Sequence, residues 1–234
     1  MKRDLKNFVV VVMSLGVVGV ARGIPPTTVL SINDGVDPVI TISDNGAGDL
    51  NPAIGVLTLS TNVGVWSLTI STGATKPGLG SSTNPVMDLV IQASSTGAGS
   101  LTYTFSDSSF THGPATLNST VSGQVISGAP TTIKYNVFGD PSNIVGALTT
   151  QLTTTGTVPL PILTSNSGSL AFATPFSLSQ VVLLTASGAS AVSVDASLNV
   201  SSVPEPSSVA LTFLGLVFLV TGLAHRRRSL HSVN

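Results

Sequence analysis

The segment Trp66–Ser71, which reads WSLTIS, alternates apolar and hydroxyl side chains residue by residue. Such period-two alternation is typical of a β-strand with one buried face and one solvated face. Leu101–Phe105 (LTYTF) and Ala191–Val200 (AVSVDASLNV) repeat the pattern. Between residues 24 and 203 no segment has the apolar period of an amphipathic helix. The middle of the chain therefore predicts an all-β domain.

Turn-forming residues separate the alternating segments. Asn33–Gly35 (NDG) and Asp44–Asp49 (DNGAGD) are rich in Asn and Gly, which accept the positive φ angles of tight turns. Ten to twelve short strands at this spacing predict an antiparallel β-sandwich, either immunoglobulin-like or jelly-roll-like. Exposed loops are expected over Gly73–Pro85 and Val158–Gly168. The expected strands are Thr27–Asn33, Pro38–Ser43, Ile54–Ser60, Val63–Ser71, Val86–Ala93, Ser100–Ser106, Thr120–Ile126, Thr131–Phe138, Leu148–Thr154, Ser169–Ala173, Ser177–Thr185 and Ala191–Val200.

The β-rich part of the chain is acidic. Between residues 24 and 203 two lysines, Lys76 and Lys134, stand against eight aspartates, a net charge of −6. An acidic surface argues against nucleic acid and anionic membrane as partners. The chain has no cysteine, so no disulfide can stabilise the domain, and its stability must come from an apolar core.

Near the C-terminus, residues 207–225 carry no acidic, lysine or arginine side chain. An 18-residue helix is about 27 Å long, close to the ~30 Å hydrocarbon core of a bilayer. Arg226, Arg227 and Arg228 follow at once, as the positive-inside rule expects on the cytoplasmic side. The sequence predicts a transmembrane helix over 207–225 and a basic cytoplasmic tail over 226–234. The alternative is a buried core helix, but little chain remains downstream to cover it.

The tripeptide Pro204-Glu205-Pro206 lies just before this apolar segment, and Glu205 is the only glutamate of the chain. Pro-Glu-Pro, an apolar helix and an arginine cluster at the end of the chain closely resemble the PEP-CTERM sorting signal of exosortase substrates in envelope-bearing bacteria. The resemblance covers residues 203–228. It implies export, and cleavage near the motif by an exosortase-like membrane transpeptidase, often alongside exopolysaccharide production. It implies no activity for the exported part.

The N-terminus predicts a matching export signal. Lys2, Arg3 and Lys6 precede the apolar run Phe8–Val20, and Ala21–Gly23 (ARG) offers small residues for signal peptidase cleavage before residue 24. An uncleaved N-terminal anchor is the alternative. The expected organisation is a signal peptide (1–23), an exported β-sandwich (24–198), a linker with the sorting motif (199–206), a transmembrane helix (207–225) and a basic tail (226–234).

Residues that could carry catalysis are scarce. The exported part has one histidine, His112, no cysteine, and no glutamate before Glu205. A Ser-His-Asp hydrolase would need His112 as its base, yet no nucleophile-elbow motif singles out a serine. A zinc site cannot be assembled from one histidine. A solvated loop histidine is the favoured interpretation, and the sequence predicts a protein that is not an enzyme.

Calcium is the remaining cofactor hypothesis. Asp44 and Asp49 place carboxylates on a glycine-rich turn, and hard cations bind carboxylate and carbonyl oxygens. The EF-hand spacing and its bidentate glutamate are missing. Ordinary turn chemistry is therefore favoured, these two aspartates are weak metal candidates, and no cofactor is expected.

The aromatic residues could stack on sugar rings or fill the core. Trp66, Tyr103, Phe105, Tyr135 and Phe138 all lie in expected strands, most with apolar neighbours two positions away, which favours the core.

The sequence thus predicts a membrane-anchored surface protein, with residues 24–206 outside the cytoplasm, that is processed by an exosortase. We expect a structural or adhesive role in the bacterial envelope or an extracellular polysaccharide (biofilm) matrix. The alternative is a carbohydrate-binding module, with or without calcium. The expected partners are the export machinery, signal peptidase, an exosortase, the membrane and polysaccharide, but no nucleic acid.

Overall fold

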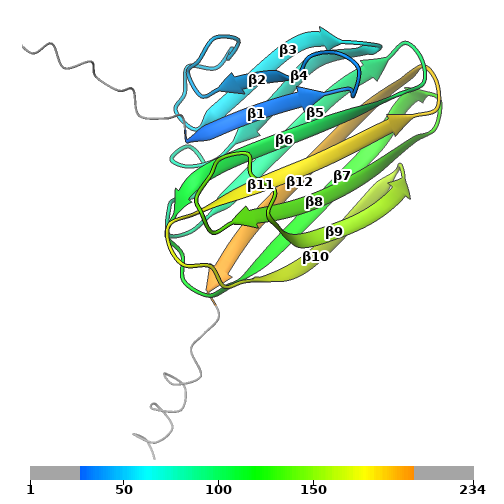
Figure 1. The fold of residues 1–234 in the computed structure, drawn as a ribbon. Helices are drawn as coiled ribbons and strands as arrows, with labels where there is room; N and C mark the ends of the chain where they lie inside the picture. The colour runs from blue at the N-terminus through cyan, green and yellow to red at the C-terminus, as the bar shows by residue number, and fades with distance from the viewer. Residues whose placement is uncertain (1–26, 203–234) are drawn as a thin grey trace, which may run out of the picture.

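The computed structural model describes residues 27–202, which form twelve β-strands in two stacked sheets (Figure 1). The expected signal peptide, sorting motif, transmembrane helix and basic tail lie outside the described residues. Within residues 27–202 there is no helix long and apolar enough to span a bilayer. The strands are β1 (Thr28–Asn33), β2 (Ile40–Ser43), β3 (Val56–Val63), β4 (Trp66–Ala74), β5 (Val86–Ser95), β6 (Gly99–Phe110), β7 (Ala115–Gly128), β8 (Thr131–Asp140), β9 (Thr150–Pro159), β10 (Ile162–Leu170), β11 (Phe176–Ala186) and β12 (Ser190–Ser202).

The predicted antiparallel sandwich is confirmed. One sheet, sheet A, has the order β2-β1-β6-β11-β8-β9, and the other, sheet B, has the order β10-β7-β12-β5-β4-β3. The hydrogen-bonded pairs β5–β12, β6–β11, β7–β10 and β8–β9 alternate between the sheets, as in one long hairpin rolled up. This is the jelly-roll arrangement, which β1–β2 and β3–β4 widen at one side.

Apolar side chains from the facing sides of the two sheets form one continuous core. Leu101, Tyr103 and Phe105 of β6 point inward, as their alternation predicted, and each is fully buried. The core is packed tightly enough to require a glycine. A Cβ atom at Gly73 of β4 would lie 2.6 Å from a ring carbon of Phe105, so a larger residue there would displace the ring.

The alternation in β4 holds only for its first half. Trp66 and Leu68 are buried, but Ile70 is 52% exposed while Ser71 is fully buried. A register shift between Leu68 and Ile70, against β5, inserts one extra residue at this point. Such a β-bulge exchanges the inward and outward positions of the residues that follow it. Ser71 is satisfied in the core because its hydroxyl lies 3.3 Å from the hydroxyl of Tyr103.

The prediction of a loop over Val158–Gly168 and a strand over Ser169–Ala173 is wrong. Residues 162–170 form β10, which pairs with β7 along its whole length, and the following residues lie outside any strand. β10 is an edge strand with mostly exposed or half-buried residues until Leu170, so its sequence ILTSNSGSL has no apolar alternation to reveal it.

The loop between β4 and β5 was predicted as exposed over Gly73–Pro85, but its first residues are buried. Thr75 is fully buried, and the Lys76 ammonium lies 2.7 Å from the Asp107 carboxylate and 4.4 Å from the Phe110 ring centroid. Burial raises the pKa of Asp107, and the charge of Lys76 opposes that rise. The loop is thus held to β6 by an ion pair inside the end of the sandwich.

The two ends of the sandwich differ in their connections. The turns that follow β1, β3, β5, β7, β9 and β11 lie at one end, as the pairings fix. The described chain both starts and finishes at the opposite end, where β1 begins and β12 ends (Figure 1). β12 continues through Ser202, within the segment assigned from sequence to the linker.

Candidate functional site

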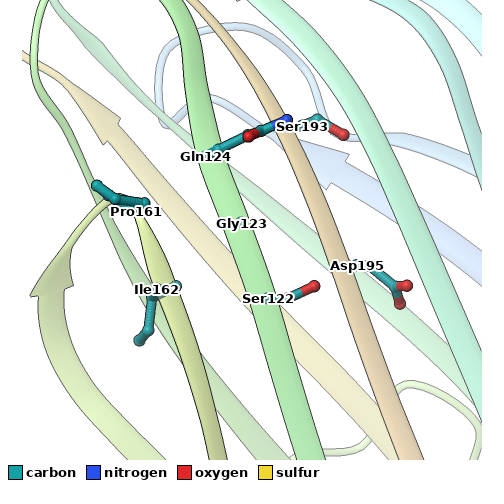
Figure 2. Close-up of a pocket in the computed structure, with 7 residues that line it drawn as sticks. All are labelled: Ser122, Gly123, Gln124, Pro161, Ile162, Ser193 and Asp195. Carbon is teal, nitrogen blue, oxygen red and sulfur yellow. The ribbon is translucent and has the colours of Figure 1, made fainter.

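The outer face of sheet B carries a polar groove with a volume of about 290 Å³. β7 and β12 form its base, where Asp195 lies directly opposite Ser122 and Ser193 lies directly opposite Gln124. The start of β10 forms one side. Figure 2 shows the Gln124 side chain extending from β7 toward β12. The lining residues are Ser122, Gly123, Gln124, Pro161, Ile162, Ser193 and Asp195.

The polar side chains of the groove have unused hydrogen-bonding capacity. Some hydroxyl groups elsewhere on the same face bond to one another across strands, as Thr58 does to Thr72 at 3.2 Å and Thr120 to Ser165 at 3.0 Å. The side chains of Ser122, Gln124 and Ser193 make no such bond within residues 27–202. Their donors and acceptors are therefore available to a ligand, and together they offer both kinds.

A second aspartate lies one strand away from Asp195. Asp88 of β5 is paired with Ser197, while Asp195 is paired with Val90, so the two carboxylates are diagonal neighbours on the outer face. Burial, and then the negative charge of Asp195, raise the pKa of Asp88 to about 6. Near pH 6 Asp88 is therefore only partly ionised.

No cation balances these carboxylates in the described part of the chain. Residues 27–202 contain two lysines and no arginine. Lys76 is paired with Asp107 at the end of the sandwich. Lys134 lies on the outer face of sheet A, because its neighbours Ile133 and Tyr135 are buried in the core. The outer face of sheet B thus carries negative charge that neither lysine of residues 27–202 balances.

The weak metal candidates Asp44 and Asp49 are engaged in turn hydrogen bonds. The Asp44 carboxylate accepts a hydrogen bond from the Gly55 amide at 2.9 Å. Asp49 accepts from the Asn45 amide at 2.9 Å and from the Thr58 amide at 3.0 Å. These carboxylates close the β2–β3 loop. Within residues 27–202 no group of three or more His, Cys, Asp or Glu side chains could hold a metal ion.

The candidate base His112 lies in the β6–β7 loop. Its Nδ1 atom lies 2.9 Å from the carbonyl oxygen of Gly113, and no serine or aspartate side chain of the described residues is hydrogen-bonded to the ring. The convergence that a hydrolase triad requires is not seen.

Four of the five aromatic side chains expected in the core lie there, and the prediction is wrong for the fifth, Phe138. Trp66, Tyr103, Phe105 and Tyr135 are at most 1% exposed, while Phe138 on the outer face of sheet A is half-buried. Neither Trp66 nor Tyr103 is available for stacking on a sugar ring. Any sugar in the sheet B groove would be held by hydrogen bonds and apolar edges instead.

The groove was not predicted from the sequence. Its base comes from segments about seventy residues apart, β7 and β12, and only their pairing brings Ser122 beside Asp195. One signal was present: Asp195 lies at an outward position in the middle of an alternating strand, whereas most of the other aspartates lie in or near turns.

No protein-family model and no curated protein matches the chain. Among solved structures, the K1 cleaved adhesin domain of Lys-gingipain from Porphyromonas gingivalis W83 is similar, with 12% identity and a TM-score of 0.31 over 64% of this chain and 99% of that chain. The CBM22-1 xylan-binding domain from Paenibacillus barcinonensis Xyn10C has 13% identity and a TM-score of 0.32, over 64% of this chain and 88% of that chain. TmCBM61, solved with β-1,4-galactotriose, has 7% identity and a TM-score of 0.29, over 55% of this chain and 86% of that chain. At these TM-scores such likeness says nothing of what the groove binds.

Proposed function

We propose that the jelly-roll domain is a non-catalytic, adhesive module that binds polysaccharide in the groove on the outer face of sheet B. The observation that carries this proposal is the set of unpaired polar side chains, Ser122, Gln124 and Ser193, gathered beside the Asp195 carboxylate. Sugars present rows of hydroxyl groups that donate and accept, and these side chains offer the complementary groups.

The size of the groove favours weak binding of one short segment of a polysaccharide chain. Its volume of about 290 Å³ lies at the lower limit of small-molecule sites, so it would hold a short segment of a chain. Four hydrogen bonds of about 1 kcal/mol each correspond to a Kd on the order of 1 mM. Many copies on one surface would raise the effective affinity for a polymer. Such avidity suits an adhesive role.

A surface location is part of the same proposal. The resemblance of Pro204–Pro206 to a sorting motif and the basic cluster at Arg226–Arg228 support export, anchoring by residues 207–225 and processing by an exosortase-like enzyme. Because the described chain starts and finishes at one end of the sandwich, the turns after the odd-numbered strands would face away from the membrane. Mass spectrometry of the protein from its native surface tests this part. A product that still carries the arginines would contradict processing.

The groove is tested with the full chain in detergent, run on native gels that contain neutral polysaccharides identified on a glycan array. Ser193→Trp places a large ring in the groove, whereas Ser167→Trp adds the same ring at an exposed position of β10 outside it. We expect Ser193→Trp to lose retardation and Ser167→Trp to keep it. Equal retardation of both variants, or binding of no array glycan by the wild-type protein, would overturn the proposal.

A further inference from the structure

We infer that the groove selects its glycan by charge: it accepts uncharged polysaccharide segments and rejects segments that carry carboxylate, sulfate or phosphate groups. The inference rests on the proposed function, since it names the class of glycan that the same groove takes. It is argued from the charges on the outer face of sheet B, and from the places where the two lysines of the domain lie.

The first step is the position of the two carboxylates. Asp195 lines the groove itself, opposite Ser122. Asp88 lies on the next strand at a diagonal position on the same face. A sugar hydroxyl near Asp195 can donate a hydrogen bond to the carboxylate. A neutral sugar makes this bond without bringing a second negative charge close to Asp195. An acidic group at that point would face two carboxylates on one side.

The second step is that the groove has no cation to compensate. Acidic sugars are usually held by arginine or lysine, because their anionic groups lose hydration on binding. In residues 27–202 one lysine, Lys76, forms an ion pair with Asp107, and the other, Lys134, lies on the outer face of the opposite sheet. An acidic segment in the groove would thus meet like charge only, which disfavours binding.

The third step is how the preference for neutral over acidic glycans depends on pH and salt. Asp88 has its full charge only above its pKa of about 6, so rejection of acidic chains is strongest at higher pH. Tyr135 lies beneath this face with its hydroxyl hydrogen-bonded to Gln180 at 2.6 Å, and it adds no charge because burial raises its pKa. Salt screens exposed charges and weakens the discrimination.

The test uses pairs of oligosaccharides that share a backbone and differ at C6, where one member carries a carboxylate and the other an uncharged group. The probes are galacturonate hexamers with and without methyl esters, and cellulose hexamers with and without oxidation at C6. The full chain in detergent is titrated with each by NMR at low salt and about pH 8, well above the Asp88 pKa of about 6. We expect binding of at least one neutral member, with its acidic counterpart weaker by roughly tenfold or more.

Two variants separate the groove from the general charge of the domain. Asp195→Asn removes the groove carboxylate, and Asp37→Asn removes one charge from the exposed β1–β2 loop while keeping an oxygen to accept from Gly64. Asp195→Asn should reduce the difference in affinity between the neutral and the acidic member of each pair. Asp37→Asn should leave that difference unchanged. Equal binding of both members by wild type, or equal effects of the two variants, would overturn the inference alone. Binding of neither member of either pair would overturn the proposed function together with the inference.

Discussion

Two pairs of charged residues in this domain show opposite arrangements. At one end of the sandwich, Lys76 and Asp107 form a close ion pair that is further bonded to the Thr75 hydroxyl at 2.9 Å. On the outer face of sheet B, Asp88 and Asp195 place like charges on neighbouring strands, and neither lysine of residues 27–202 balances them. The first pair is matched and largely buried, and the second is unmatched, with Asp195 exposed and Asp88 half-buried.

This difference separates a structural role from a functional one. The Asp107 charge has a partner because an uncompensated buried carboxylate would cost several kcal/mol. Asp88 and Asp195 repel one another, and burial together with the Asp195 charge raises the pKa of Asp88. Groups that oppose stability and line a cavity are typical of functional sites. The comparison therefore points to the sheet B groove as the site of recognition.

The largest effect is expected from breaking the matched pair. Lys76→Met leaves the Asp107 carboxylate buried without its ammonium, and it also removes the cation from the Phe110 ring. We expect a loss of about 3–5 kcal/mol in the free energy of unfolding, measured by urea denaturation of the full chain.

The double variant Lys76→Met with Asp107→Leu is the control for that loss. Replacing both charges by apolar side chains leaves no buried charge, so the double variant should recover much of the stability. If the single variant were as stable as the wild-type protein, the ion pair would have no structural role and the comparison would fail.

A smaller change in the free energy of unfolding, a gain in stability, is expected for a substitution on the outer face of sheet B. Asp88→Asn removes one of two neighbouring carboxylates while keeping a polar side chain. A pKa rise from 3.8 to about 6 corresponds to about 3 kcal/mol. Screening at a side chain that is half exposed reduces this to about 1 kcal/mol. We expect Asp88→Asn to be more stable by about that amount at neutral pH, in the same denaturation experiment. A destabilised variant would show that the carboxylate supports the fold.

The pH dependence of stability sharpens the same comparison. The pKa of Asp88 is higher in the folded chain than in the unfolded chain, so the folded state binds more protons between the two values. Stability from this group is greatest below about pH 4 and falls as the pH rises through about 6. Because the pKa of Asp107 is raised too, the difference between wild type and Asp88→Asn isolates Asp88. Parallel curves for the two proteins would contradict the assignment.

The smallest effect is expected from a carboxylate outside both pairs. Asp37 lies in the exposed β1–β2 loop, and its side chain accepts a hydrogen bond from the Gly64 amide at 2.9 Å. Asp37→Asn keeps an acceptor, so the free energy of unfolding should change by less than about 0.5 kcal/mol. A larger change would mean that net charge, rather than position, decides how a carboxylate affects this domain.

The strands could be predicted where one face of a strand is buried. Alternation revealed β6 and most of β12, because their inward residues are apolar and their outward ones are polar. It failed at Ile70, where a bulge shifts the register, and at β10, whose edge position leaves nearly every side chain at least partly exposed. Both failures follow from pairing with another strand, which local sequence does not encode.

The site was harder to predict than the fold. Ser122 and Asp195 become neighbours only because β7 pairs with β12, and a serine or glutamine in a strand looks the same whether its hydrogen bonds are used or free. The aspartates that drew attention in the sequence, Asp44 and Asp49, proved to close a loop. Their dense clustering reflects turn chemistry, whereas the groove has a single aspartate at an outward strand position.

The central claim is that the groove between β7, β10 and β12 binds glycan, and mapping of backbone amide shifts by NMR tests it most directly. The full chain in detergent would be titrated with a neutral oligosaccharide that it binds on the array. The account predicts that the largest shifts lie at residues 122–124 and 193–195, with little change on the outer face of sheet A. Shifts centred on sheet A or on the loops at either end of the sandwich would contradict it.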